Sequence, residues 1–165
     1  MSYEYSENIL VQESAANLLR DELGWNIEFA YNREVLGVNG TLGRESYKEI
    51  LLKPRFRKAL KRLNPWINDK QIQEAENLFS EFSFTEDLLQ INEKKFALIR
   101  DGIPVSVIKQ DGSVEEKKAK VIDFRSAENN DFFAVKEMKI HGDIYRRRTD
   151  IVGFVNGTPL LFIEL

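Results

Sequence analysis

The stretch RRTDIVGFVNGTPLLFIEL, residues 147–165, decides the fold, because it contains two apolar strands joined by an Asn-Gly turn. Asp150 stands at the start of the first strand, and Glu164 stands near the end of the second. A hairpin brings these two ends together, so both carboxylates are expected at the same end of a sheet. Carboxylates among apolar residues are costly unless they are paired or bind a cation. The stretch therefore predicts a hairpin with a candidate acidic site.

The loop length decides whether the two acids share a face of the hairpin. A strict two-residue Asn156-Gly157 loop would pair residue 150 with residue 163 and separate the acids. A three-residue loop, over 155–157 or 156–158, would put them on one face, and we expect this form. Two carboxylates on one face can hold Mg²⁺, which prefers oxygen ligands. The alternative is that both are strand-end residues that face solvent.

Further strands are expected on the N-terminal side of this hairpin. A strand is predicted at 26–31, and a glycine-rich loop without the order of a phosphate-binding P-loop follows at 37–43. Around the turn at Asp111-Gly112 the pattern indicates a hairpin or meander, with Val105 and Val107 before the turn and Val121, Ile122 and Phe124 after it. The remaining predicted strands are 132–140, 144–155 and 159–165.

The first part of the chain has helical patterns. A helix is predicted from an N-cap at Ser6 to about Leu23, with Gly24 ending it and with one apolar stripe formed by Val11, Ala15, Leu18 and Leu19. A second pattern begins near Glu45, and Pro54 splits it from a helix over 55–63. Asn68 and Thr85 are predicted as N-caps of two more helices, at 69–82 and 86–100.

This order predicts an α/β fold with an α+β-like arrangement, in which N-terminal helices precede a mixed, largely antiparallel sheet. The length of 165 residues is that of one ordinary domain, so a single domain is expected over 1–165. The run at 159–165 is almost continuously apolar, as in a strand covered on both faces at the centre of a sheet. Because the run ends the sequence, we expect a chain truncated within its domain.

The composition excludes several classes of protein. With 24 Lys+Arg and 27 Asp+Glu the net charge is −3, so contact with DNA requires a local basic patch. The absence of cysteine excludes disulfides, zinc ribbons, thiol nucleophiles and iron–sulfur sites, and it suits the cytoplasmic location that we expect. The single histidine, His141, excludes a site built on two. No apolar run has the length of a membrane span.

Two basic segments are candidates for DNA contact. On the predicted helix over 55–63, three cations lie along one exposed flank: Arg55, Lys58 and Arg62. Next to the first acid, alternation puts Arg146 and Arg148 on the face of Asp150. The alternatives are a solvated helix face for the first group and ion pairs with nearby carboxylates for the second.

Several blocks spread over most of the chain carry a resemblance to a known family. They are residues 13–25 (ESAANLLRDELGW), 63–65 (LNP), Asn92 with Phe96, 101–102 (DG), 122–124 (IDF), 129–132 (NNDF) and 147–165. Together they resemble the N-terminal nuclease region of the restriction (R) subunit of type I restriction-modification enzymes. The last block also resembles the metal-binding core of PD-(D/E)xK nucleases.

The resemblance implies an ATP-dependent DNA endonuclease in which Asp150 and Glu164 are the catalytic metal ligands for Mg²⁺. Glu13 is a candidate third carboxylate, although a solvated helix glutamate is the alternative. Thr149 stands where the motif has proline, and the motif lysine would directly follow Leu165.

The same resemblance implies double-stranded DNA as substrate, methyltransferase (M) and specificity (S) subunits as partners, and no membrane. ATP would bind only to motor domains that lie outside this sequence. We therefore expect a fragment that does not cleave DNA alone. The competing hypothesis is a non-catalytic DNA- or protein-binding assembly module with a vestigial metal site.

Overall fold

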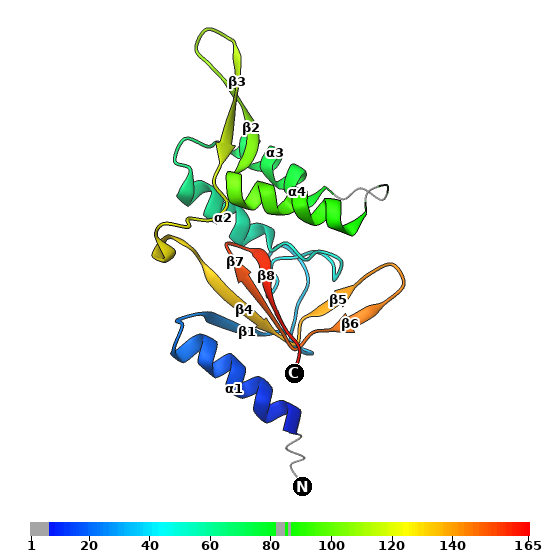
Figure 1. The fold of residues 1–165 in the computed structure, drawn as a ribbon. Coiled ribbons are helices and arrows are strands. Elements are labelled where there is room, and N and C mark those ends of the chain that lie inside the picture. Colours follow the sequence, from blue (N-terminus) through cyan, green and yellow to red (C-terminus); the bar gives the residue numbers. More distant parts are fainter. Residues whose placement is uncertain (1–6, 82–84, 86) are drawn as a thin grey trace. The chain divides into compact units, whose positions relative to one another are not determined.

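The computed structural model describes residues 7–81, 85 and 87–165, and Figure 1 shows its helices and strands. The helices are α1 (Glu7–Asp21), α2 (Lys53–Leu63), α3 (Asp69–Ser80), α4 (Leu88–Asp101) and the short 3₁₀ helix η1 (Ala127–Asn129). The strands are β1 (Asn26–Phe29), β2 (Ile103–Ile108), β3 (Val114–Ala119), β4 (Phe132–Lys136), β5 (Lys139–His141), β6 (Arg146–Arg148), β7 (Ile151–Val155) and β8 (Thr158–Ile163). No described helix combines the length and the apolar character that crossing a bilayer would require.

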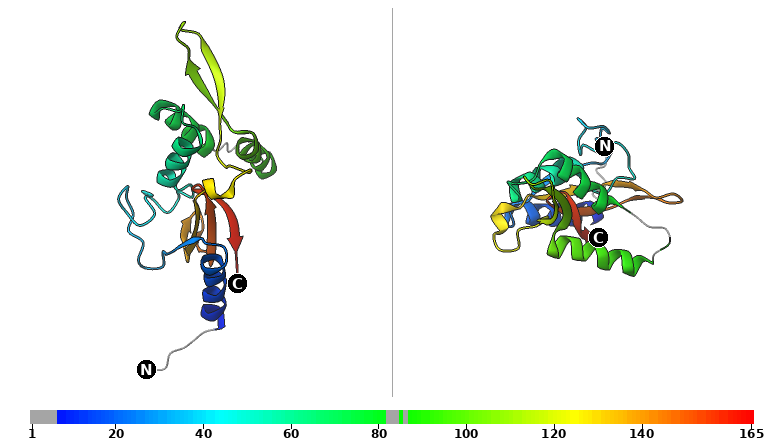
Figure 2. Two further views of the ribbon diagram at one scale, coloured as in Figure 1. Left: turned by 90° about the vertical axis from the view of Figure 1, so that its left-hand side faces the viewer. Right: turned by 90° about the horizontal axis from the view of Figure 1, so that it is seen from above.

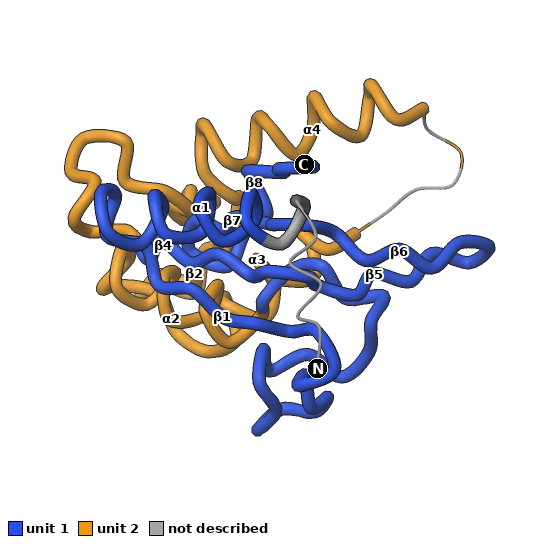
Figure 3. The backbone as a smooth tube through the Cα atoms, turned by 90° about the horizontal axis from the view of Figure 1, so that it is seen from below, with its two compact units in different colours: residues 1–52, 131–165 blue, residues 53–130 orange. Residues whose placement is uncertain are grey.

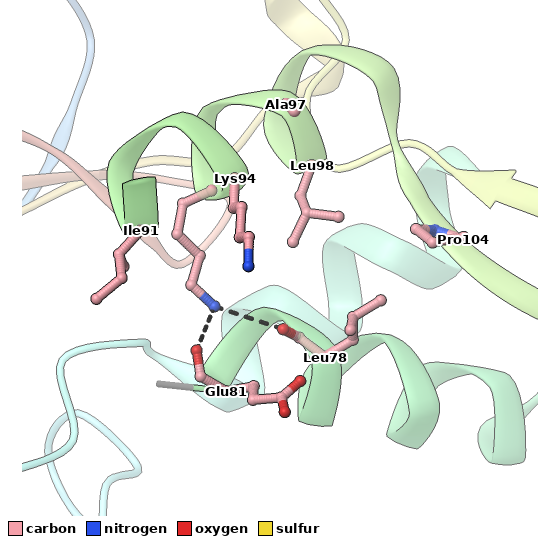
Figure 4. A pocket seen from close by; sticks show the side chains of 8 residues that line it. Leu78, Glu81, Ile91, Lys94, Ala97, Leu98 and Pro104 are labelled. Carbon is pink, nitrogen blue, oxygen red and sulfur yellow. Dashed lines mark hydrogen bonds between the residues drawn. The ribbon is translucent and has the colours of Figure 1, made fainter. Parts of the chain in front are cut away.

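The chain divides into two compact units, coloured separately in Figure 3. Unit 1 comprises residues 1–52 and 131–165, and unit 2 comprises residues 53–130. The single domain expected over 1–165 stays a prediction. Ser6, the predicted N-cap of the first helix, lies outside the described residues.

Unit 1 contains a four-stranded sheet with the order β1-β4-β7-β8. β1 is parallel to β4, whereas β4–β7 and β7–β8 are antiparallel, so the predicted mixed, largely antiparallel sheet is confirmed. One buried cluster joins α1 to the sheet through Ala16, Leu19, Ala134 and Ile151. A second cluster joins β4 and β7 to the segment after β1: Ala30, Leu42, Leu52, Phe133, Val135, Met138, Val152 and Phe154. Both clusters are built on the same sheet.

Helix α1 ends close to the predicted position, but its buried stripe differs from the prediction. Gly24 has φ of +71°, and the amide of the following residue, Trp25, donates to the carbonyl of Leu19 at 2.9 Å, as a left-handed C-terminal stop requires. Val11 and Leu18, predicted on the apolar stripe, are about half exposed. Of the predicted stripe, Leu19 is buried and Ala15 is half-buried, and the other buried residues on this side of the helix are Gln12 and Ala16.

The helix predicted near Glu45 is wrong, because residues 45–52 have no helix. A buried ion pair organises this segment. Arg44 Nε lies 2.5 Å from Glu34 Oε1, and both side chains are almost fully buried. The Arg44 guanidinium also donates to the carbonyls of Glu49 at 3.1 Å and Lys139 at 2.7 Å. A tertiary contact thus takes the Glu49 carbonyl, a backbone acceptor that a helix over this segment would have used.

The central position predicted for the strand at 159–165 is wrong within the described residues. β8 pairs with β7 alone and forms an edge of the sheet. Accordingly, Leu160 and Phe162 are exposed, while the intervening Leu161 packs against the α1 cluster. The covered face of β8 carries Leu161 and Ile163, whereas Leu160 and Phe162 are apolar side chains on its exposed face.

Among its described residues, unit 2 contains the helices α2, α3, α4 and η1 and the β2–β3 hairpin, which Figure 2 draws as a long ribbon. Asn68 is the N-cap of α3 in a reciprocal capping box with Gln71, as predicted for this position. The N-cap of α4 is Asp87, whose side chain accepts from the Gln90 amide at 2.8 Å, and not the predicted Thr85. Aspartate is a strong N-cap type, and its position moves the start of the helix to Leu88.

The return strand of the unit 2 hairpin is β3, so the strand predicted around Val121, Ile122 and Phe124 is wrong. β3 has the sequence VEEKKA and is exposed except at Ala119, which is why it carries no apolar alternation. Just after it, the Asn64 side chain donates to the Lys120 carbonyl at 2.9 Å and accepts from its amide at 2.8 Å. The backbone groups of Lys120 therefore bond to a side chain and not to the neighbouring strand.

Candidate functional site

The β7–β8 hairpin turns through two residues, so the predicted three-residue loop is wrong. Val155 pairs with Thr158, and the loop residues Asn156 and Gly157 have φ of +54° and +79°. Two positive φ values are those of a type I′ turn, for which Asn-Gly is a preferred sequence. The Asn156 side chain also accepts from the Asp131 amide at 2.8 Å, which anchors the turn within unit 1.

A β-bulge in β8 nevertheless shifts the register by one residue, as the predicted three-residue loop would have done. Phe154 pairs with Pro159, but Gly153 pairs with Leu161, so Leu160 is an additional residue on β8. Beyond the bulge, Ile151 pairs with Ile163. Continued by one residue, this register sets Glu164 opposite Asp150, a pairing that an unbulged two-residue hairpin would not give.

Gly153 is required at this bulge. A Cβ built on Gly153 would lie 2.8 Å from Leu161 Cβ and 2.8 Å from Trp25 Cζ3, both shorter than real Cβ contacts. The indole of Trp25 therefore packs directly against the backbone of β7. Glycine is the residue that allows this approach where the register changes.

The Asp150 carboxylate is half-buried and is held by hydrogen bonds on both oxygens. Gln12 Nε2 on α1 donates to Oδ1 at 2.6 Å, and the Leu165 amide donates to Oδ2 at 2.7 Å. The Asp150 carbonyl accepts from the Glu137 amide at 2.8 Å, and the preceding Thr149 amide donates to Met138 at 3.0 Å. These bonds fix the side chain and the backbone, while each carboxylate oxygen retains a lone pair for a further ligand.

The other two predicted acids are exposed. Glu164 follows β8 directly, and Glu13 lies one residue beyond the buried Gln12 on α1. The helix side chain that contacts Asp150 is thus the amide of Gln12, which is 6% exposed, and not the carboxylate of Glu13. The sequence contained a usable signal, since Gln12 precedes Ala16 by four residues and so belongs to the same helical stripe.

The residues at this end of the sheet fit a magnesium ion that has only one or two ligands from the protein. Within the part of the chain that the structure describes, no group of three or more His, Cys, Asp or Glu side chains gathers around one point. Mg²⁺ is commonly bound by one or two carboxylates and keeps several waters. Asp150, held in place, and Glu164, placed opposite it by the register, supply that number of ligands.

The predicted basic residues occur in both units. In unit 1, Arg146 and Arg148 are exposed on β6, and the Arg148 guanidinium lies 4.6 Å from the centre of the Tyr31 ring. In unit 2, Lys58 and Arg62 are exposed on α2, as predicted, whereas Arg55 is half-buried, and the buried face of the helix contains Phe56 and Leu60. Arg62 Nε donates to the Asn129 carbonyl at 2.9 Å.

Comparison with known proteins gives a family match over nearly the whole sequence. The family model described as "Type I restriction enzyme R protein N terminus (HSDR_N)" matches residues 4–165. The "Type I restriction enzyme HindI endonuclease subunit" of Haemophilus influenzae is 29% identical over 161 residues, which are 97% of this chain and 15% of that protein. The "Putative type I restriction enzyme MjaIXP endonuclease subunit" of Methanocaldococcus jannaschii is 27% identical over 124 residues, 73% of this chain and 12% of that protein.

This chain therefore spans only about 15% of the length of the first of these relatives and 12% of the second. Most of the length of each relative therefore lies outside the part that matches this chain.

Proposed function

The chain belongs to the family of type I restriction enzyme R protein N-terminal regions, and from this membership we propose that it is part of the DNA-cleaving site of such a subunit. The observation that supports this function is the held carboxylate of Asp150, with Glu164 opposite it in the hairpin register. A sheet end with two carboxylates, one of them fixed before any ligand binds, suits a divalent cation. We propose the PD-(D/E)xK arrangement for this sheet on the same grounds.

In the proposed site Asp150 and Glu164 hold Mg²⁺, which supplies an activated water and neutralises charge on the scissile phosphate. Gln12 and the Leu165 amide keep the Asp150 carboxylate in one orientation. Mutation of such outer contacts commonly lowers metal affinity or activity by about 10–100-fold. Arg146 and Arg148 on β6 bind DNA phosphates near this carboxylate, and Arg55, Lys58 and Arg62 are a second proposed phosphate-binding group on unit 2.

The proposed activity needs groups outside this sequence. By the resemblance, the motif lysine would stand at position 166, and ATP would bind to motor domains in the remainder of the subunit. M and S subunits complete the complex that acts on double-stranded DNA. We propose accordingly that the 165-residue chain alone does not cleave DNA.

The test uses the full-length subunit assembled with its partners. Asp150→Asn and Glu164→Gln should each abolish DNA cleavage and leave DNA-stimulated ATP hydrolysis within about twofold of the parent, because the motor does not use the carboxylate pair. Glu22→Gln, which changes an exposed glutamate just after α1, is the matched control and should cleave normally. Cleavage that survives both site substitutions would rule out the proposed site.

A second candidate function is a binding module with a vestigial metal site. The exposure of Glu164 and the lack of a third acidic ligand among the described residues favour it. Titration of the chain with Mg²⁺ or Mn²⁺, in parallel with Asp150→Asn, separates the two functions. Metal binding that disappears in Asp150→Asn supports the nuclease site, whereas binding that is independent of Asp150 supports the module.

A further inference from the structure

Strands β5 and β6 form a two-stranded ribbon of their own in unit 1. The turn between them is closed by a hydrogen bond from the Gly142 amide to the Tyr145 carbonyl at 2.8 Å. Figures 1 and 3 both show this β5–β6 ribbon, residues 139–148, extending as an arm from the four-stranded sheet of the same unit.

One face of the β5–β6 ribbon carries all but one of its basic side chains. Lys139 pairs with Arg148, and His141 pairs with Arg146. Directly opposite residues and residues two apart share a face of a ribbon, so these four side chains lie together. The remaining pair, Ile140 with Arg147, lies on the other face, where Ile140 packs against the second core cluster of unit 1. The four-residue basic face is therefore turned away from that core.

This arrangement leaves positive charge without a protein counterion. Like charges directly opposite each other, such as Lys139 and Arg148, are destabilising in a ladder. Among the side chains that the structure describes, none of the three arginines of β6 forms an ion pair. The acid of the ribbon, Asp143, is engaged elsewhere, with its Oδ1 at 2.6 Å from Lys48 Nζ. The basic face is thus suited to an external anion.

Aromatic rings contact three side chains of the basic face. Arg148 lies over Tyr31, and the Lys139 ammonium lies 5.9 Å from the centre of the Tyr47 ring. The Tyr47 ring also contacts His141, with 4.7 Å between the ring centres. A cation held over a ring keeps its charge exposed, so these contacts orient the basic groups without neutralising them.

The tip of the ribbon carries two exposed hydrophobic side chains next to Asp143. Ile144 is 84% exposed and Tyr145 is 69% exposed. A two-stranded β-ribbon is narrow enough to enter the major groove of duplex DNA. In that position cations on the ribbon face reach phosphates, and side chains at the tip reach base edges or sugars.

The basic residues of α2 differ from those of the ribbon in their protein partners. Arg57 forms a bidentate ion pair with Glu76, Lys61 pairs with Asp69 at 2.6 Å, and Arg62 donates to Asn129. Much of the positive charge of α2 thus serves contacts within unit 2. The ribbon arginines, by contrast, form no ion pair with any side chain that the structure describes.

We propose that the β5–β6 ribbon is a DNA-binding arm in which Lys139, Arg146 and Arg148 contact phosphates while Ile144 and Tyr145 enter a groove. The inference rests on the proposed function for its choice of duplex DNA as the anion. Thr149 joins the ribbon to Asp150, and its buried side chain and amide both bond to the Met138 carbonyl. DNA bound on the arm is thereby held next to the candidate metal ligand.

The test measures binding of the 165-residue chain to a fluorescent 30-base-pair duplex by anisotropy, in EDTA and at several salt concentrations. The double variant Arg146→Gln/Arg148→Gln should bind at least tenfold more weakly and should lower the slope of log K against log salt by about 2. Arg100→Gln/Lys109→Gln, which removes the same charge from exposed sites on unit 2, should retain parental affinity and slope. Equal binding by the two double variants would overturn the proposal.

Three further measurements complete the test. Ile144→Ser should weaken binding severalfold at an unchanged salt slope, because it removes an apolar contact. Polyglutamate at equal charge concentration should displace the chain from DNA poorly, and displacement as strong as by unlabelled duplex would indicate an acidic-protein site instead. Thermal unfolding monitored by circular dichroism identifies any variant that fails to fold.

Failure of the arm and failure of the proposed nuclease function are distinguishable. Asp150→Asn should bind DNA like the parent in EDTA, since the arm does not use the carboxylate pair. If the full-length subunit with Asp150→Asn still cleaves DNA, the proposed nuclease site is wrong. The DNA-binding arm is then still supported by the salt dependence of DNA binding. If cleavage depends on Asp150 but DNA affinity is independent of Arg146 and Arg148, the proposed DNA-binding arm is wrong and the proposed nuclease site is retained.

Discussion

The Gln12 carboxamide donates a 2.6 Å hydrogen bond to Asp150 Oδ1 and so links the first helix to the start of β7, 138 residues later in the chain. Gln12 is buried on the stripe of α1 that packs against the sheet. The bond therefore transmits the position of the helix to the carboxylate proposed as a metal ligand.

Replacement of Gln12 should weaken metal binding without unfolding the protein. We expect Gln12→Ala to lower the Mn²⁺ affinity of the chain by about tenfold or more, the usual effect of removing a group that orients a ligand. Isothermal titration calorimetry measures this affinity. Gln73→Ala, which removes an exposed glutamine bonded to Asn77, is the control and should leave it unchanged. Equal affinities for the two variants would show that Gln12 does not orient Asp150.

Gly153→Ala should destabilise unit 1 by disturbing the bulge. The new methyl group would meet Leu161 Cβ and the Trp25 ring at 2.8 Å, and forced overpacking of this kind costs about 1–3 kcal/mol. Urea unfolding monitored by tryptophan fluorescence reports both the loss and any change around Trp25. Gly142→Ala has room for its Cβ, with the Tyr145 carbonyl oxygen at 3.5 Å, and should unfold at nearly the parental urea concentration.

Arg44→Ala should be among the most destabilising substitutions in unit 1. It would leave the Glu34 carboxylate buried without its cation and would also free the carbonyls of Glu49 and Lys139. Breaking a buried pair from one side costs about 3–5 kcal/mol. Urea denaturation gives the free energy of unfolding, and Arg20→Ala at an exposed pair should shift the midpoint far less. A similar shift in both variants would contradict the structural role of Arg44.

Asp123 should contribute stability that depends on pH in the acidic range. Its carboxylate accepts bonds from the Asn129 side chain and from the amides of Arg125 and Ser126, and these bonds hold its pKa below the ordinary value of 3.8. Because the folded pKa is lowered, the contribution is complete above the unfolded pKa and is lost as pH falls through the folded value. An NMR titration of the Arg125 amide should give a midpoint below 3.8, and the stability difference from Asp123→Asn should shrink in the same range. A midpoint above 3.8 would exclude these bonds.

Local signals in the sequence predicted many of the elements correctly. Gly24 ends α1 because glycine adopts positive φ without strain, and Asn68 begins α3 because its side chain reaches the Gln71 amide. The Asn156-Gly157 pair marks the hairpin turn for the same backbone reason. Each of these outcomes depends on a residue and its close neighbours in the chain.

Two predictions failed where a side chain outside the local pattern decided the structure. Residues 45–52 have no helix, and Arg44, paired with Glu34, takes the Glu49 carbonyl in this segment as a partner. Lys120 leaves the β3 strand because Asn64 satisfies its backbone. In both cases one side chain takes backbone hydrogen bonds that a regular helix or strand would have used. The local sequence pattern does not indicate which side chain will do this.

The sequence by itself determined that two acids, Asp150 and Glu164, stand at matching ends of adjacent strands. Only the tertiary structure decided their alignment and the partner of Asp150. The extra residue Leu160 changes the register where Trp25 packs against Gly153, and burial of the α1 stripe brings Gln12 to the carboxylate. Register and helix rotation are set by packing between segments far apart in the chain, and a one-residue change in either moves a side chain to another face.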